Sequence, residues 1–302
     1  MKQVAVLLVT YNRVSLLKES LRAILLQSYP INHIIIVDNH STDATVQFLE
    51  SIRDDKRIIV KRMSQNVGGA GGFFEGISLF QRKLDDDYLW IMDDDTIPND
   101  DALMELSHAW GQYPDFGFLA SNVRWVNGTS AIMNVPAVDP IRWSSTIDPK
   151  KGIFFPIVTH ASFVSIIITR SVVYKVGLPI KEFFIWGDDV EYTERISSLY
   201  DSYFVPKSVV VHKTKANTGV DIVEENSDRI GRYYYDVRNQ FYRAKKANGK
   251  KRIKLLGKLW VDYNRVLFGR RVSLRWKKVG VMTRGIVSGI FFNPPITFIG
   301  KG

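Results

Sequence analysis

Short apolar runs alternate with amphipathic segments along the first part of the chain. The runs typical of buried strands are residues 4–9, 34–37, 58–60 and 88–92. The segments with apolar side chains at helical spacing are residues 14–27, 43–52 and 70–82, the second entered through Ser41 and Thr42 as helix caps. Repeated strand–helix units predict an α/β fold with a mostly parallel sheet flanked by helices.

The pattern is less regular after residue 100. Turn-forming pairs such as Asn-Gly, Val-Pro and Asp-Pro interrupt residues 127–156, which we interpret as a substrate-shaping insertion. The strands predicted in this part are 118–126, 163–169 and 205–211, and the helices are 100–113, 188–200 and 228–247. The remaining stretch, 250–290, alternates basic and large apolar residues without an internal repeat.

Composition narrows the class of protein. The 302 residues suffice for one large domain or two small ones, and the lack of cysteine excludes disulfides, thiolate metal sites and a cysteine nucleophile. No uninterrupted apolar stretch reaches the roughly 18 residues of a membrane-spanning helix. Polar residues without a small-residue cleavage site follow the N-terminal apolar run, so it predicts a first strand rather than a signal peptide.

The net charge of +10 is unevenly distributed along the chain. From Arg243 to the end there are 16 Lys and Arg and one acidic residue, Asp262, for a charge of +15. The residues before Arg243 carry 25 basic and 30 acidic side chains, for a charge of −5. A basic segment that also holds Trp260 and Trp276 predicts a helix on an anionic membrane surface, with a solvated basic face or a partner subunit as alternatives.

Three consecutive aspartates, Asp93 to Asp95, follow the apolar run at 88–92. Like charges this close repel, and burying them is costly without a compensating cation. Carboxylates at the carboxyl end of a strand suit Mg²⁺ or Mn²⁺, which also bind phosphate oxygens, and ligands of open α/β sheets bind at this edge. A solvated acidic turn, with Asp100 or Asp101 capping the next helix, is the alternative.

The first two strands also end in polar side chains at this edge, namely Thr10, Tyr11, Asn12, Arg13, Asp38 and Asn39. Thr10 and Tyr11 can flank a base ring, and Asp38 can accept hydrogen bonds from a base or ribose, although each alone also fits a turn or cap. A glycine-rich segment that opens a helix follows the third strand and begins with Asn66, Gly68, Gly69 and Ala70. Its glycines permit close backbone approach and its helix N-terminus favours anions, which predicts phosphate contact.

The order of these motifs (Thr-Tyr-Asn, Asp-Asn, the glycine segment and Asp-Asp-Asp) resembles the nucleotide-sugar domain of family 2 glycosyltransferases with the GT-A fold. The resemblance implies an inverting transferase with a Rossmann-like sheet, a sugar-nucleotide donor and a bound Mn²⁺ or Mg²⁺. It also implies that Asp95 is a direct metal ligand, that Asp93 lies near the metal or ribose, and that Asp94 serves either role. His212, at the end of a predicted strand, resembles a further metal ligand of the family.

A second acidic pair, Asp188 and Asp189, follows the aromatic stretch Phe-Phe-Ile-Trp and precedes a predicted helix. Inversion requires a general base that deprotonates the acceptor hydroxyl while the diphosphate leaves from the opposite face. The pair resembles the aspartate base motif of the family, so Asp189 is the predicted base and Asp188 the second choice. Capping of the helix by Asp188 is compatible with this. Trp186 and His160 are predicted to line the acceptor site.

Within the family the motifs Asn-Val-Gly-Gly-Ala-Gly-Gly-Phe and Trp-Gly-Asp-Asp-Val-Glu-Tyr look most like galactofuranosyltransferases. The same frame and the stretch 234–239 also serve rhamnosyltransferases. UDP-galactofuranose is therefore the expected donor and dTDP-rhamnose the second. The expected acceptor is a lipid-linked glycan of cell-surface polysaccharide synthesis. The protein is expected to be cytoplasmic and to bind peripherally to the inner face of the plasma membrane.

These expectations divide the chain into two regions. Residues 1–225 are the expected GT-A catalytic domain, with a nucleotide-sugar half (1–126) and an acceptor half (127–225). Residues 226–302 are an expected basic helical extension for membrane or partner contact. The rival from another class is a nucleic-acid-binding protein that uses the basic tail, although the acidic body holds no recognisable nucleic-acid module. A non-catalytic sugar-nucleotide binder is a further alternative, which the two intact acidic motifs argue against.

Overall fold

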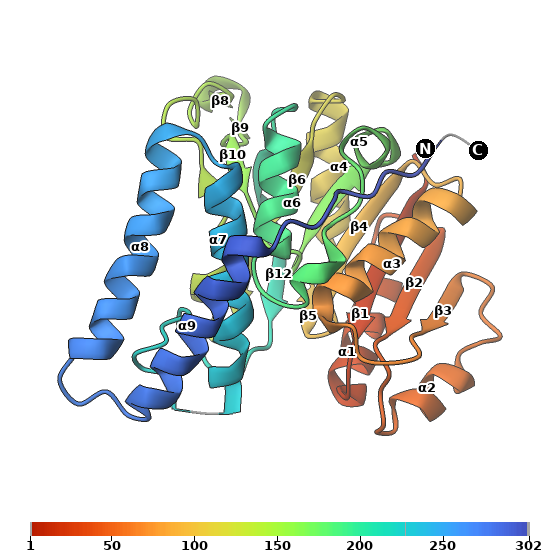
Figure 1. Ribbon diagram of the computed structural model, residues 1–302. Helices are drawn as coiled ribbons and strands as arrows, with labels where there is room; N and C mark the ends of the chain where they lie inside the picture. Colours follow the sequence, from red (N-terminus) through yellow and green to blue (C-terminus); the bar gives the residue numbers. More distant parts are fainter. Residues whose placement is uncertain (1, 227, 301–302) are drawn as a thin grey trace.

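The computed structural model describes residues 2–226 and 228–300. Within these residues the main element is an eight-stranded sheet of order β3-β2-β1-β4-β11-β6-β12-β5 (Figure 1). The strands are β1 (Val4–Thr10), β2 (His33–Asp38), β3 (Ile58–Arg62), β4 (Tyr88–Asp93), β5 (Thr96–Pro98), β6 (Phe118–Trp125), β11 (Ile166–Thr169) and β12 (Tyr203–His212).

The strand directions bring polar strand ends together. The strands β3, β2, β1 and β4 are mutually parallel, as are β6 and β12, whereas β11 and β5 run antiparallel to their neighbours. The register places Thr10 beside Asp38 and Val9 beside Asp93. The predicted α/β class and mostly parallel sheet are confirmed, and the two acidic strand ends flank β1.

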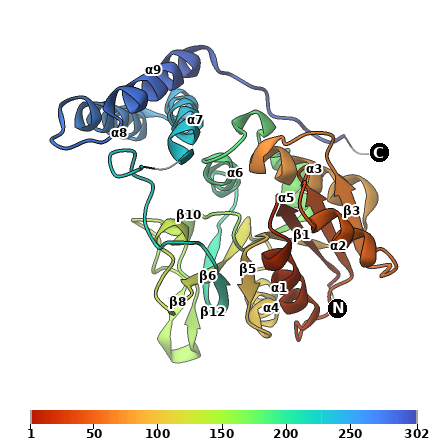
Figure 2. The same ribbon diagram turned by 90° about the horizontal axis from the view of Figure 1, so that it is seen from below.

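Helices cover both faces of the sheet (Figure 2). On one face α1 (Val14–Leu25), α2 (Thr45–Ser51) and α4 (Ala102–Gln112) pack on the side chains that β1 directs there, including Val6 and Leu8. On the other face lie α3 (Gly68–Lys83), α5 (Arg170–Val176) and α6 (Asp188–Ser197). The apolar and almost fully buried strands β1 and β2 are what such double coverage requires.

The basic end of the chain forms a separate helical layer, as predicted. A 3₁₀ turn (Asp228–Arg232) leads into α7 (Tyr233–Lys246), α8 (Gly249–Phe268) and α9 (Arg275–Phe291), which pack around Val237, Leu259 and Val281. After α9 the chain runs back along the sheet domain towards the N-terminus (Figure 1). There the amide of Leu178 donates to the carbonyl of Thr297 at 2.8 Å, which ties this end to the loop after α5.

The sequence predicts no regular element for residues 127–156. In the structure this segment contains only short strands and 3₁₀ turns. Two small ribbons pair β7 (Ala137–Val138) with β10 (Val158–His160) and β8 (Ile147–Asp148) with β9 (Ile153–Phe154). Single 3₁₀ turns span Ile132–Asn134 and Pro149–Lys151, and a third, Lys181–Phe183, precedes α6.

Several local predictions are wrong. Capping of α2 by Ser41 and Thr42 does not occur, because the helix begins at Thr45 and the Asp43 carboxylate accepts from the Thr45 amide at 3.0 Å. The predicted helix 228–247 is split, since its first turn is 3₁₀. The strand β5 and the helix α5 were not predicted: β5 has three residues, too few for a periodic pattern, and α5 continues directly from β11.

Candidate active site

Three side chains predicted as metal ligands converge at the carboxyl edge of the sheet. Asp93 ends β4, Asp95 follows it, and His212 ends β12. One potential ligand atom from each lies within 4.8 Å of the others, and Nε2 of His212 is 3.0 Å from Oδ1 of Asp95. Carboxylate oxygens with an imidazole nitrogen form a donor set suited to Mn²⁺, and the oxygens also suit Mg²⁺.

Asn134 orients the imidazole of His212. Its Oδ1 lies 2.8 Å from Nδ1 of His212, while its Nδ2 donates to Oγ of Ser162 at 2.9 Å. The amide oxygen can only accept, so Nδ1 carries a proton. In the neutral imidazole the lone pair of Nε2 would then face the Asp95 carboxylate, and the hydrogen bond with Asp95 raises the pKa of His212 despite its burial. Two acceptors facing each other at 3.0 Å require a proton or a cation between them, and a fixed tautomer of this kind is typical of metal-bound histidine.

The charges of the triplet favour a bound cation. Burial, together with the charge of Asp95, raises the pKa of Asp93 to about 7. Burial likewise raises the pKa of Asp94 to about 6, although Arg13 opposes the shift. The pKa of Asp95 is lowered despite its burial, because His212 and Arg13 stabilise its charged form. The residues present therefore fit a divalent ion, which would offset the cost of burying these carboxylates and the repulsion between them.

Asp94 is bound by other residues of the donor side rather than grouped with the three ligand atoms. It accepts from Oγ1 of Thr10 at 2.7 Å and from Nη1 of Arg13 at 3.2 Å, and the same guanidinium nitrogen lies 2.6 Å from Oδ2 of Asp95. Arg13 is thus a fixed positive charge beside the carboxylates, and about half of its side chain remains exposed. Thr10, Arg13 and Asp94 stay predicted donor-binding residues, and the structure shows how they hold one another in place.

The other polar residues at the ends of β1 and β2 accept hydrogen bonds from the loop at residues 41–42. Asp38 is fully buried; its Oδ1 accepts from the amide of Ser41 at 2.9 Å, and its Oδ2 lies 3.4 Å from Nε of Arg62. Asn12 has a left-handed backbone (φ 54°), and its Oδ1 accepts from the amide of Thr42 at 2.7 Å. Contact of Asp38 with a base or ribose therefore stays a prediction. Arg62, half-exposed beside it, is a cation that the sequence did not single out.

Asn39 fixes the start of the glycine segment. Its Nδ2 donates to Oδ1 of Asn66 and to the carbonyl of Gly68, both at 3.0 Å, and its Oδ1 accepts from the amide of Val67 at 2.9 Å. Oδ1 of Asn66 also accepts from the amide of Gly68 at 2.9 Å. This network turns the chain into α3 at Gly68, where φ is 75°. These contacts within the protein define the predicted phosphate-binding turn.

Part of the glycine segment serves packing rather than ligand approach. A Cβ added to Gly72 would lie 2.4 Å from Cγ1 of Val9, and one added to Gly76 would lie 2.2 Å from Cδ1 of Leu7. These glycines let α3 lie close to β1. A Cβ at Gly69 would meet nothing within 4 Å, so close backbone approach to a ligand stays a prediction for the first turn of the helix. Tyr11, which is 42% exposed, also borders open space.

The acidic pair opens α6, and Asp188 interacts electrostatically with Asp93. Gly187 is the N-cap residue, so capping by Asp188 is wrong, and Oδ1 of Asp189 accepts from the amide of Val190 at 2.7 Å. Burial, with the charges of Asp189 and Asp93 nearby, raises the pKa of Asp188 well above its ordinary value. Burial also raises the pKa of Asp189, and Arg243 opposes this shift. A carboxylate whose pKa is raised is a stronger base near neutral pH, as a catalytic base requires.

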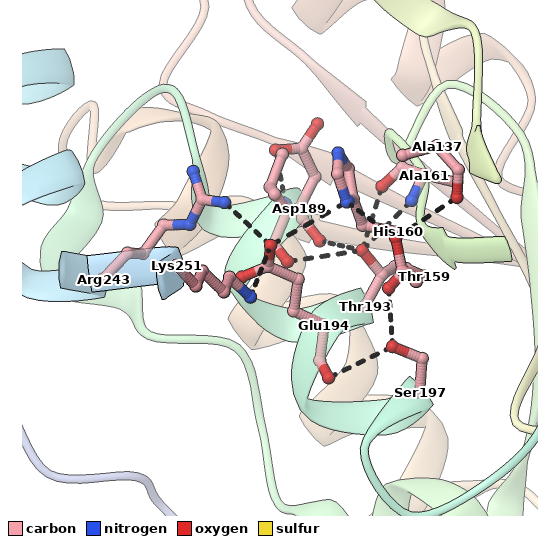
Figure 3. A network of polar contacts seen from close by, with 11 residues as sticks. Ala137, Thr159, His160, Ala161, Asp189, Thr193, Glu194, Ser197, Arg243 and Lys251 are labelled. Atoms are coloured by element: carbon pink, nitrogen blue, oxygen red, sulfur yellow. Dashed lines mark hydrogen bonds and ion pairs between the residues drawn. The ribbon is translucent and has the colours of Figure 1, made fainter. Parts of the chain in front are cut away.

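Basic side chains from α7 and α8 contact Glu194, which follows Asp189 on α6 (Figure 3). Glu194 pairs with Arg243 at 2.9 Å and with Lys251 at 3.0 Å, and its Oε1 lies 3.8 Å from Nδ1 of His160. Burial lowers the pKa of His160, and Arg243 and Lys251 add to the effect while Glu194 opposes it. His160 is therefore neutral at pH 7 and lies in the same polar network as the first turn of α6 (Figure 3).

Comparison with known proteins bears on the family and the fold of the chain. The family model described as glycosyl transferase family 2 matches residues 5–177. Among curated proteins, poly-beta-1,6-N-acetyl-D-glucosamine synthase of Staphylococcus aureus (strain COL) is 26% identical over 133 residues, which are 44% of this chain and 31% of that protein. The synthase of the same description from Staphylococcus epidermidis is 24% identical over 136 residues. The chain thus spans about a third of the length of the curated relatives it matches.

Among solved structures, S. aureus TarS 1-349 superimposes with a TM-score of 0.59 at 16% identity, over 95% of this chain and 81% of that one. The same protein in complex with UDP-GlcNAc gives a TM-score of 0.59 with the same coverage. This likeness shows the fold and confirms the expected GT-A arrangement with its helical C-terminal layer.

Proposed function

The chain belongs to glycosyl transferase family 2, and we propose that it is an inverting, metal-dependent glycosyltransferase that takes its sugar from a nucleotide-sugar donor. One observation carries the proposal: Asp93, Asp95 and His212 form a divalent-ion donor set, and the buried carboxyl of Asp188 lies close enough for the charge of Asp93 to raise its pKa. A site for a diphosphate-bound ion and a candidate base thus meet at one edge of the sheet.

The roles of the residues follow from their positions. Mn²⁺ or Mg²⁺ held by Asp93, Asp95 and His212 would offset the charge of the departing diphosphate. Arg13 adds a fixed positive charge at the same place. Asp189, or Asp188 in its place, accepts the proton of the acceptor hydroxyl as that oxygen attacks the anomeric carbon and the bond to the diphosphate breaks.

The proposed donor is UDP-galactofuranose, with dTDP-rhamnose as the second candidate. The choice between these sugars rests on the resemblance of the Asn-Val-Gly-Gly-Ala-Gly-Gly-Phe and Trp-Gly-Asp-Asp-Val-Glu-Tyr stretches. The structural relative described in complex with UDP-GlcNAc carries a uridine nucleotide, which supports UDP as the nucleotide of the donor. The nucleotide would lie between the end of β1 and the glycine turn, where Tyr11 and Gly69 are accessible.

The proposed acceptor is a lipid-linked glycan at the cytoplasmic face of the plasma membrane, reached through the helical layer. No helix among the described residues is both long and apolar enough to cross a bilayer. The helices α8 and α9 nevertheless expose Trp260, Phe268 and Trp276 by 69%, 73% and 75%. Trp260 also borders an apolar groove of about 240 Å³ between the three C-terminal helices. Aromatic side chains on a strongly basic helical surface fit an anionic lipid bilayer.

A calorimetric titration of UDP and, separately, dTDP, each with and without Mn²⁺, tests this function. We expect Mn²⁺-dependent binding of UDP. A preference for dTDP would keep the mechanism and move the donor to rhamnose. If neither nucleotide binds with or without the ion, the transferase proposal is wrong. Salt-dependent binding to DNA would then favour the nucleic-acid alternative.

A further inference from the structure

The segment that leads into the acidic pair has an unusual backbone. Phe184 has φ 65° and ψ −60°, and the amide of Ile185 donates to the carbonyl of Phe183 at 2.7 Å. Residues 183–185 therefore form a γ-turn of the rare positive-φ form. Trp186 (φ 65°) and Gly187 (φ 86°) continue in left-handed conformations. Such a backbone is strained for residues with side chains and persists only where the surrounding structure holds it.

Asn239 of α7 holds this segment. It is 1% exposed, and its Nδ2 donates to the carbonyls of Phe183 (3.0 Å), Ile185 (3.2 Å) and Trp186 (2.9 Å). Two amide hydrogens are thus shared among three carbonyl oxygens, and that of Phe183 also accepts from the amide of Ile185 and from Nη2 of Arg238. One side chain therefore binds three carbonyls of the strained segment, which lies 53 to 56 positions away in the sequence.

Arg238 orients that amide. Its Nε and Nη2 donate to Oδ1 of Asn239 at 3.1 and 3.0 Å, which directs Nδ2 towards the turn. Nη2 also donates to the carbonyl of Glu182 at 2.6 Å. The guanidinium lies 3.9 Å from the centre of the Phe292 ring, a cation–π contact that fixes its plane. The adjacent pair therefore acts as a single clamp.

The clamped segment joins both sides of the candidate site. The carbonyl of Phe184 accepts from the amide of Ala70 at 3.1 Å. A Cβ at Gly68 would lie 2.0 Å from the same oxygen, so the turn lies directly against the start of α3. Two residues after Trp186 the chain reaches Asp188. A change in this turn would thus move the candidate base relative to the donor side of the site.

We propose that Asn239, oriented by Arg238, is a positioning residue for sugar transfer: it fixes the strained turn that places Asp188 and Asp189 opposite the donor site. The proposal rests on the proposed function. Because the amide of Asn239 is occupied by the turn, it acts through the segment 183–187 rather than on the substrate. This gives a role to the Arg-Asn pair that ends the stretch 234–239.

The test replaces Asn239 with leucine, which keeps the branched shape with a larger volume and removes the donors. The control is Asn248→Leu, because Asn248 is exposed and its side chain makes no cap bond with α8. We would measure three quantities: the kcat of transfer from UDP-galactofuranose to a lipid extract, the Kd of UDP with Mn²⁺, and hydrogen exchange of residues 182–187. All are compared at a temperature at which circular dichroism shows each variant folded.

We expect kcat to fall at least about tenfold, on the scale of one lost buried hydrogen bond, while the Kd of UDP changes far less and exchange of 182–187 quickens. A variant with normal kcat and normal exchange overturns the proposal, and so does an equal loss in kcat and UDP affinity. If Asn239→Leu does not fold, Arg238→Lys, which loses the paired donors to Asn239, is measured in the same way. If the wild-type protein transfers sugar neither from UDP-galactofuranose nor from dTDP-rhamnose, the proposed function fails, and the exchange data alone decide whether the clamp exists.

Discussion

Nε2 of His212 lies 3.0 Å from Oδ1 of Asp95, although the two residues are 117 positions apart in the sequence. The contact arises because β5 pairs with β12 and brings Thr96 opposite His212. The amide of Lys213 also donates to the carbonyl of Asp95 at 2.9 Å. The donor set we propose for the metal therefore forms only when the last strand of the sheet is in place.

Replacement of Asp95 by alanine should weaken metal-dependent donor binding. The change removes one of three ligand groups, so we expect the Mn²⁺-dependent affinity for UDP to fall at least about tenfold, on the scale of changes around metal sites. Calorimetry with and without Mn²⁺ measures it. Asp100→Ala is the control, since it removes the same charge from an exposed position a few residues away. Unchanged metal dependence in Asp95→Ala would remove this residue as a ligand.

Asn134 should act on the metal site through His212. Asn134→Ala removes the acceptor for Nδ1, which frees the ring to change tautomer, and we expect about 10- to 100-fold weaker Mn²⁺ affinity. Asn134→Asp keeps an oxygen at this position and should retain most of the affinity. The affinity for Mn²⁺ is measured by titration calorimetry or by electron paramagnetic resonance of the free ion. Equal affinities in both variants would show that the contact does not tune the site.

The parts of the site at the ends of parallel strands could be predicted from the sequence. Apolar runs identify the strands, and the carboxyl ends of parallel neighbours must meet at one edge, so Thr10 and Asp93 were expected near each other. Asn134 could not be found in this way. It lies in a segment without hydrophobic periodicity, and only the fold brings its amide to His212.

The glycine segment shows a second limit of sequence reasoning. A glycine can be needed because a ligand approaches the backbone or because a neighbouring strand packs against it. The sequence does not distinguish these two roles, since both depend on the missing Cβ. Only the structure shows that Gly72 and Gly76 face Val9 and Leu7. The clamp on the γ-turn was equally hidden, because Asn239 lies more than 50 residues after the turn and no local pattern links them.

His160 should make stability depend on pH. Its folded-state pKa is lowered, chiefly by burial, so between that value and the ordinary pKa of about 6.5 the unfolded chain binds a proton that the folded chain does not. Stability should therefore fall as pH drops through this window, by at most about 1.4 kcal/mol per pH unit. Below the folded-state pKa this contribution is constant.

Urea unfolding of His160→Gln from pH 7 to pH 5 measures the effect. We expect a shallower loss of stability than in the wild-type protein, because the replacement does not titrate. His108→Gln is the matched control, since it removes an exposed histidine from α4. Parallel pH profiles for wild type and His160→Gln would contradict the assigned shift.

The exposed tryptophans of the helical layer should drive membrane contact. We expect Trp260→Ser with Trp276→Ser to reduce co-sedimentation with vesicles of phosphatidylglycerol and phosphatidylcholine at least about tenfold at low salt, since each loses a large apolar side chain. Trp143→Ser is the control, because Trp143 is exposed on the 127–156 segment. Equal binding of all variants, or equal binding to vesicles of phosphatidylcholine alone, would show that this surface does not dock on anionic lipid.

The central claim is that the acidic start of α6 supplies the base for metal-dependent sugar transfer. The most direct test compares wild type and Asp189→Asn for transfer of labelled galactofuranose from its UDP donor to a lipid extract, with Mn²⁺ present and absent. We predict Mn²⁺-dependent transfer by the wild type. The variant should bind UDP with unchanged affinity and transfer about 10²- to 10⁴-fold more slowly, the usual contribution of a general base. Full activity of Asp189→Asn would remove Asp189 as the base, and wild-type transfer that is independent of Mn²⁺ would contradict the metal-dependent mechanism.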